Sequence, residues 1–169
     1  VGMAFEYFAN ENVDIAIIET GLGGRLDSTN IINPILSIIT NIGMDHMALL
    51  GNTLSEIASE KAGIIKATTP VVISEVIPET KNIFEQKATS LHAPIYFADD
   101  FIQFKSFQNN WQSSLFEFNQ PHIHLLDAPL FPKSFTVECD LPGKYQYKNL
   151  KGVLVAIQLL ATMGWKLHA

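Results

Sequence analysis

Residues 34–65 of the chain read PILSIITNIGMDHMALLGNTLSEIASEKAGII. The first part, residues 34–43, is a β-branched and apolar run of the kind that forms a buried strand. After a loop, Thr53 and Glu56 have the spacing of a capping box, which starts a helix. The apolar residues that follow recur at helical spacing: Leu54, Ile57, Ala58, Ala62 and Ile65. The stretch therefore predicts a strand, a loop and a helix.

Similar strand-like runs lie on both sides of this unit. Residues 13–19, VDIAIIE, are expected to form a buried parallel strand. Residues 70–75 and 93–98 predict two more strands, with a helix over residues 79–92 between them. This alternation indicates an α/β fold with a mostly parallel sheet and right-handed crossover helices. In open sheets of this kind, ligands bind beyond the carboxyl ends of the strands.

The composition changes after about residue 100. Segments with aromatic or β-branched alternation, at 101–107, 113–119, 122–126 and 134–139, predict a small antiparallel β meander. The motif LPGK then precedes a helix over residues 145–165, whose interior is almost wholly apolar and is therefore expected to be buried. We find no internal repeat, low-complexity tract or linker, so one domain is favoured.

Composition limits the classes of function. The chain has 169 residues and 47% hydrophobic content, which suit a globular domain with a real core. Its net charge of −6 argues against a nucleic-acid or anionic-membrane surface. The single cysteine, Cys139, cannot form an internal disulfide, which fits a cytoplasmic location. No apolar run approaches the roughly 18 residues that a membrane span needs.

Two residues with metal-binding side chains follow predicted strands. Glu19 ends the run 13–19, and His46 lies in the loop after the run 34–43. If the two strands are neighbours, both side chains face one cleft. Magnesium takes only one or two protein ligands beside waters and phosphates, although an imidazole by itself suits zinc or manganese better. The alternative is that His46 hydrogen-bonds a loop carbonyl.

The glycine-rich loop GLGGRLDSTN, residues 21–30, admits two interpretations. A dinucleotide-binding fingerprint would require glycine at Leu26 and a helix after it, so an oxidoreductase ranks low. The glycines either supply positive φ or let a ligand approach closely. Arg25 and Asp27 favour recognition of a polar ligand. Lys61 lies near the buried side of its helix, where it either reaches solvent along its apolar stem or has a chemical role.

The chain resembles the central domain of folylpolyglutamate synthase and dihydrofolate synthase, the folate branch of the Mur-ligase superfamily. Three blocks carry the resemblance: ETGLGGRLDSTN, TNIGMDHMALLGNTLSEIASEKAGIIK and LPGKYQYKNL. It is strong over residues 13–75, thins across the meander and returns over residues 141–162. These ligases transfer the γ-phosphate of ATP to a substrate carboxylate, and the amine of glutamate then attacks the acyl phosphate. The resemblance implies ATP and Mg²⁺ as cofactors, and folate or dihydropteroate and L-glutamate as substrates.

The resemblance also implies roles on the metal side of the site. Glu19 and His46 correspond to the protein ligands of a magnesium ion between the phosphate and the acyl phosphate. Lys61 corresponds to the lysine that the family carries as a carbamate. A carbamate would replace a buried cation with a carboxylate and so remove the cost of burying an ammonium group.

Nucleotide and substrate contacts are implied elsewhere in the chain. Asn149 corresponds to the asparagine that hydrogen-bonds the adenine at the start of the last helix, and Gln146 is a weaker candidate. Asp27 falls where the folate branch contacts the pterin, and Arg25 lies beside it on the same loop.

Parts of the family pattern are not found in residues 1–169. The family has a G-x-x-x-x-G-K-[ST] phosphate loop upstream and a glutamate-binding domain downstream, and neither is matched. We therefore expect a partial central ATPase domain, inactive by itself, from a monomeric parent enzyme. The alternative is a non-catalytic nucleotide-binding or scaffold module of the same fold.

Overall fold

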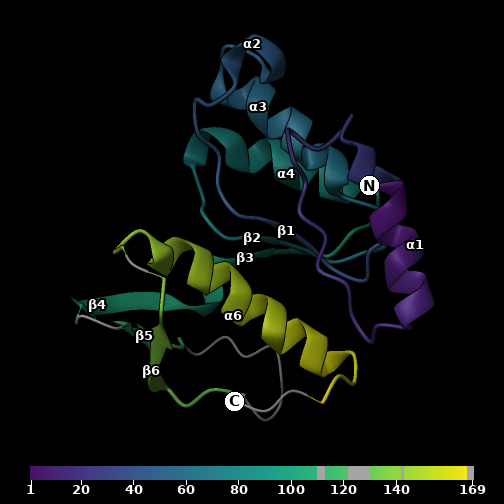
Figure 1. The fold of residues 1–169 in the computed structure, drawn as a ribbon. Helices are drawn as coiled ribbons and strands as arrows, with labels where there is room; N and C mark the ends of the chain where they lie inside the picture. The colour runs from purple at the N-terminus through teal and green to yellow at the C-terminus, as the bar shows by residue number, and fades with distance from the viewer. Residues whose placement is uncertain (110–112, 122–129, 142, 167–169) are drawn as a thin grey trace.

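The structure is a computed structural model that describes residues 1–109, 113–121, 130–141 and 143–166. It contains a parallel sheet and an antiparallel sheet, separated by the long C-terminal helix α6 (Gln146–Thr162) (Figure 1). The mixed α/β fold predicted from the sequence is confirmed.

The parallel sheet has the strand order β1 (Ser37–Ile39), β2 (Val71–Ile73) and β3 (Ile95–Phe97). All three residues of β2 are buried, because the sheet is covered on both faces. Val71 and Ile73 belong to one core and Val72 to the other, as expected from the alternation of side chains along a strand. These strands are the ones predicted from residues 34–43, 70–75 and 93–98.

One face of this sheet packs against α3 (Leu54–Lys61) and α4 (Pro78–Ser90), as Figure 1 shows. The predicted capping box at the start of α3 is confirmed. The Thr53 hydroxyl accepts a hydrogen bond from the Glu56 amide (3.2 Å), and the Glu56 carboxylate accepts one from the Thr53 amide (3.1 Å). The amide of Asn52 also donates to Glu56, and these bonds lower the pKa of that carboxyl group.

The other face packs against α6, which in turn packs against the antiparallel sheet (Figure 1). That sheet has the order β4 (Gln103–Asn109), β5 (Ser114–Asn119) and β6 (Ser134–Cys139), which confirms the meander. The predicted segment 122–126 lies outside the described residues. Helix α6 is buried where it meets the two sheets, as at Val155, which is fully buried, and it is exposed at Val153, which is 45% accessible.

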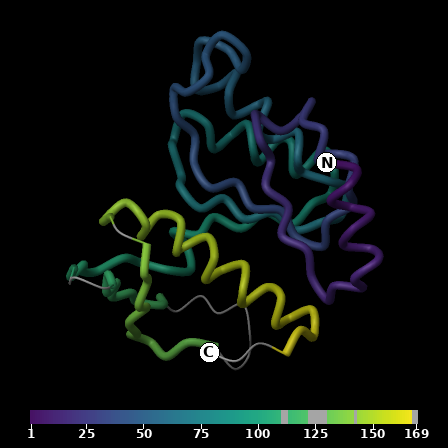
Figure 2. Tube along the Cα trace, viewed as in Figure 1, coloured from purple at the N-terminus to yellow at the C-terminus, as the bar shows by residue number. Residues whose placement is uncertain are grey.

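The remaining helical segments of the described residues are three to ten residues long. They are α1 (Gly2–Glu11), η1 (Ser28–Ile31), α2 (Met47–Leu50), η2 (Ala62–Ile64) and α5 (Ala98–Phe101). The first of them, α1, has no buried residue and lies at the margin of the fold in the trace of Figure 2. Among the described residues, no helix is long and apolar enough to cross a membrane.

The prediction of a buried strand over residues 13–19 is wrong. The segment forms no strand, and none of its residues is buried. Val13, Ile15 and Ile17 are 43%, 47% and 91% exposed. The physical reason is that a strand requires a hydrogen-bonded neighbour, and no strand of the described residues pairs with this run.

Candidate functional site

The glycine-rich loop is organised by one carboxylate, that of Asp27. One oxygen accepts hydrogen bonds from the amides of Gly21 and Leu22, both at 3.1 Å. The other accepts from the Thr29 amide at 2.8 Å and the Thr29 hydroxyl at 2.5 Å. The hydroxyl of Thr29, followed by these amides, lowers the pKa of Asp27 to about 2. Asp27 is therefore ionised at neutral pH, and both of its oxygens are engaged within the loop.

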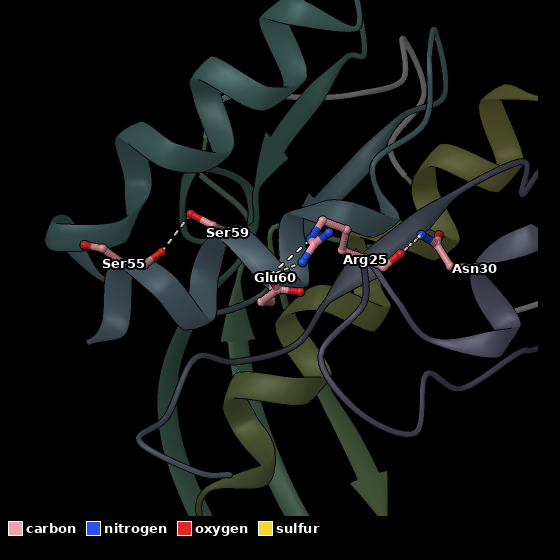
Figure 3. Close-up of polar contacts among 5 residues, drawn as sticks. All are labelled: Arg25, Asn30, Ser55, Ser59 and Glu60. Carbon is pink, nitrogen blue, oxygen red and sulfur yellow. Dashed lines mark hydrogen bonds and ion pairs between the residues drawn. The ribbon is translucent and has the colours of Figure 1, made fainter. Parts of the chain in front are cut away.

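The same loop is joined to the C-terminal end of α3. The Arg25 amide donates to the Glu60 carbonyl (2.9 Å), one of the carbonyl groups at the helix end that lack a full set of intrahelical partners. The Arg25 guanidinium donates to the Glu60 carboxylate from Nε (3.1 Å) and Nη2 (3.0 Å). Figure 3 shows the guanidinium pointing at Glu60 and the Asn30 side chain reaching the Arg25 carbonyl. Asn30 also donates to the Gly63 carbonyl at 3.1 Å.

Glycines allow this close approach of loop and helix. A Cβ atom at Gly63 would lie 2.3 Å from Arg25 Cα, and one at Gly24 would lie 2.8 Å from the Glu60 carbonyl oxygen. Gly23 has a φ of +67°, which L-residues rarely adopt. The sequence left two explanations for the glycines, positive φ or close approach of a ligand. Gly23 has the positive φ, and at Gly24 the closely approaching group is α3.

The Arg25–Glu60 ion pair is close to the surface. The two side chains are 57% and 25% exposed, so the pair itself contributes only about 0–1 kcal/mol to stability. The backbone bonds and close packing around it must therefore supply most of the energy that joins the loop to α3.

The residues predicted for the metal side are not engaged elsewhere. Within the described residues, the side chains of Glu19, His46 and Lys61 have no hydrogen bond or ion pair. Glu19 and His46 are exposed, and Lys61 is half-buried beside the buried Ala58 and Ala62. The hydrogen bond from His46 to a loop carbonyl, considered above, is not seen there. Each of these groups is free to meet a ligand.

The backbone places His46 in an unusual conformation. Its φ of 54° is in the left-handed region, where it precedes α2. Non-glycine residues adopt this conformation uncommonly, and such positions cluster at functional sites. No group of three or more His, Cys, Asp or Glu side chains that could hold a metal ion is found among the described residues. Residues 13–19 form no strand, so Glu19 does not end a strand beside the one that precedes His46, and the expectation that neighbouring strand ends bring the two residues to one cleft is not met in that form.

The structure brings the two residues predicted to hold adenine together. The Asn149 amide nitrogen donates to the Gln146 side-chain oxygen at 2.9 Å, in the first turn of α6. This contact fixes the orientation of both amides. No contact among the described residues joins this pair to Glu19 or to His46.

An open pocket of about 580 Å³ lies beside the start of α6. Its lining contains both charged and aromatic side chains: Glu75, Val76, Asp99, Gln103, Phe104, Tyr147, Lys148 and Lys151. Lys148 pairs with Glu75, which raises the pKa of Lys148, and Lys151 pairs with Asp99. These pairs tie α6 to the ends of β2 and β3, and none of the predicted site residues lines the pocket.

Sequence reasoning missed Glu60 as the partner of the loop, and it missed Asn30 as the loop residue that binds the Gly63 carbonyl. A signal for the loop itself was present, because Asp27 followed by Ser and Thr is a common start of a helical turn, and Asp27 does cap η1. No local signal indicates Glu60, which meets Arg25 from a distance of 35 residues along the chain.

Comparison with known proteins assigns this arrangement to a family. Residues 2–157 match the family model described as the Mur ligase middle domain. The folylpolyglutamate synthase of Lacticaseibacillus casei is 36% identical over 158 residues, which are 92% of this chain and 34% of that protein. The dihydrofolate synthase/folylpolyglutamate synthase of Bacillus subtilis is 51% identical over 98 residues, 57% of this chain and 23% of that protein. The chain thus spans about a third or less of the length of these relatives.

Solved structures agree with the sequence comparison. The FPGS–AMPPCP–folate complex, in which FPGS is folylpolyglutamate synthase, has a TM-score of 0.83 and 30% identity. The two chains match over 98% of this chain and 38% of the chain in that complex. The crystal structure of folylpolyglutamate synthase from Thermotoga maritima has a TM-score of 0.72 and 32% identity. The match covers 98% of this chain and 35% of the Thermotoga maritima chain. The chain therefore belongs to the Mur ligase middle-domain family, in the branch that contains the folylpolyglutamate and dihydrofolate synthases.

Proposed function

We propose that the protein carrying this chain is an ATP- and magnesium-dependent ligase that joins L-glutamate to folate or to dihydropteroate through an amide bond. The observation that carries the proposal is the match, over nearly the whole chain, to a structure that binds an ATP analogue and folate together. The unengaged side chains at Glu19, His46 and Lys61 support it, since a binding site must leave such groups available.

The reaction has two steps. A carboxylate oxygen of the acceptor attacks the γ-phosphorus of ATP, the bond to the β-phosphate oxygen breaks, and ADP leaves. The neutral amine of glutamate then attacks the carbonyl carbon of the acyl phosphate. The carbon–oxygen bond breaks, inorganic phosphate leaves, and the nitrogen loses a proton to give the amide. Transfers of this kind depend on positioning and on neutralising phosphate charge.

On the metal side, Glu19 and His46 would hold the magnesium ion. When bound, the ion neutralises the charge that develops on the phosphate oxygens. Lys61 would lie beside the transferred phosphate, either as a carbamate or as a cation. A carbamate forms from the neutral amine, so the site would have to stabilise the carbamate.

Other residues would bind the remaining parts of the substrates. Asn149 would hydrogen-bond the adenine, and its bond to Gln146 would orient it. Arg25 and Asp27 lie on the loop assigned to the pterin. Any ligand contact by these two side chains would have to compete with Glu60 or with the loop amides.

The remaining parts of the active site would come from other segments of a protein of the relatives' length. We propose that residues 1–169 form part of the central domain, with the phosphate loop and the glutamate-binding domain supplied from outside them. A monomeric protein in the cytoplasm is part of the proposal, and the single cysteine supports the cytoplasmic location alone.

The test is a ligation assay on the protein of full length. It is incubated with ATP, Mg²⁺, L-glutamate and either dihydropteroate or folate, and products are identified by mass spectrometry. We expect a glutamate adduct and ADP with at least one acceptor, and no adduct from residues 1–169 alone. ATP binding without product on either acceptor would overturn the ligase and favour a non-catalytic nucleotide-binding module. Ligation by residues 1–169 alone would overturn the assignment of essential groups to other segments.

A further inference from the structure

The glycine-rich loop contacts the end of α3 at residues on both sides of Lys61, namely Glu60 and Gly63. Glu60 is bound by the Arg25 amide and guanidinium, and Gly63 is bound through its carbonyl by Asn30. The carbonyl oxygen of Lys61 would lie only 3.0 Å from a Cβ atom at Gly24. The backbone of Lys61 is thus held between two attachment points, while its own side chain has no partner among the described residues.

A further hydrogen bond links the loop to the segment that follows α3. The Lys66 ammonium donates to the Asn30 carbonyl at 2.6 Å, so Asn30 contacts the helix-end segment through both its side chain and its backbone. The Asn30 side-chain amide also donates a hydrogen bond to the Arg25 carbonyl at 3.2 Å. Arg25 and Asn30 therefore act as one unit against the end of α3 (Figure 3).

We propose that Arg25 is a positioning residue for Lys61, acting through Glu60, and that it is not the substrate ligand expected from its place on the pterin loop, because Glu60 already holds its guanidinium. The guanidinium adds two hydrogen bonds to the backbone bond that joins the loop to the helix end that carries Lys61. Both guanidinium bonds, from Nε and Nη2, go to a single carboxylate oxygen of Glu60. The role assigned to Arg25 rests on the proposed function, because Lys61 is the group whose placement matters.

A positioning role differs measurably from a structural one. An exposed ion pair contributes little to stability, so its removal should leave the thermal midpoint nearly unchanged. A displacement of about 1 Å at a reacting group, in contrast, can lower a rate about 10²-fold. A direct substrate contact would instead raise the KM for the acceptor. These three roles give three different patterns.

The experiment compares Arg25→Met, Glu60→Gln and the exchanged pair Arg25→Glu/Glu60→Arg in the full-length protein. We expect kcat to fall about 10-fold or more in each single variant, with KM values within about 3-fold of wild type, and to recover in part in the exchanged pair. The matched control is the exposed pair Lys105–Glu117 of the meander, where Lys105→Met should change neither parameter. Amide hydrogen exchange of residues 60–66 is measured on the same proteins and should become faster only in the Arg25 and Glu60 variants.

Each outcome decides the proposal. Unchanged exchange over residues 60–66 would show that the pair does not hold the helix end, and faster exchange with unchanged kcat would show that holding it has no catalytic consequence. A raised acceptor KM without loss of kcat would make Arg25 a substrate ligand. Any of these results overturns the inference. If the wild-type protein ligates neither acceptor, the proposed function fails, and the exchange data still show whether the pair holds the helix end.

Discussion

Replacing Gly63 with alanine should destabilise the chain, because the added methyl group has no room. It would lie 2.3 Å from Arg25 Cα, 2.4 Å from Arg25 Cβ and 2.6 Å from the Arg25 nitrogen. These atoms belong to the backbone or its first side-chain carbon, so the loop must move away from the helix end. Overpacking of this kind costs about 1–3 kcal/mol.

Two smaller effects act in opposite directions. The movement should lengthen the hydrogen bond from Asn30 to the Gly63 carbonyl, now 3.1 Å, which is worth about 1 kcal/mol. Alanine also restricts the unfolded chain, which stabilises the folded state by about 0.4–1 kcal/mol. The net loss for Gly63→Ala should be about 1–3 kcal/mol, or roughly 2–12 °C in the thermal midpoint for a chain of this size.

Urea unfolding followed by circular dichroism measures this loss, and Gly21→Ala is the matched control. A Cβ atom at Gly21 would meet only the Asp27 carboxylate, at an ordinary 3.5 Å. The control should stay within about 0.5 kcal/mol of wild type. If Gly63→Ala unfolds at the wild-type urea concentration, or if Gly21→Ala loses as much stability, the loop and the end of α3 are not packed as described.

Three further outcomes are expected from the local contacts. Asp27→Asn should destabilise the chain near neutral pH, and the difference in stability from wild type should shrink as the pH falls from about 4 to 2. The pKa of Asp27 in the folded chain, about 2, lies below its ordinary 3.8, so the ionised carboxylate stabilises the fold above pH 3.8 and this stabilisation is lost as the pH falls through 2. Thermal unfolding across this pH range checks the trend. Thr53→Ala should cost about 1 kcal/mol in urea unfolding, because it removes the side chain that caps α3. Gly152→Ala should lower the free energy of unfolding by about 1–3 kcal/mol, since its Cβ atom would lie 1.7 Å from the buried Ser74 hydroxyl. Adding Ser74→Gly should restore part of the loss, and no restoration would contradict the close packing of α6 on β2.

The parts of the fold that could be predicted are those set by neighbouring residues. The capping box at Thr53 and the covered strand over residues 71–73 depend on local hydrogen bonding and on continuous apolar character, both of which are visible in the sequence. The run 13–19 has the same apolar character but no neighbouring strand among the described residues. Local pattern cannot reveal whether a strand has a partner, so this prediction failed.

The candidate site divides in the same way. The resemblance selected Gln146 and Asn149, and their spacing on one turn of α6 allows the hydrogen bond that the structure shows. The contact between Arg25 and Glu60 spans 35 residues and depends on how the loop packs on α3, which no local pattern specifies. The metal, nucleotide and substrate roles of all these residues stay predictions.

The most direct test of the proposed ligase is the magnesium dependence of ATP turnover in the full-length protein. ADP release in the presence of acceptor and glutamate is measured for Glu19→Gln, His46→Gln and the double variant, with Asp45→Asn as the control at an exposed neighbouring carboxylate. If Glu19 and His46 hold one magnesium ion, each single variant should lose about 10²-fold in rate and need more Mg²⁺ for half-maximal activity, and the double variant should be little worse than the poorer single. Wild-type magnesium dependence in both single variants would contradict the metal assignment and with it the proposed site.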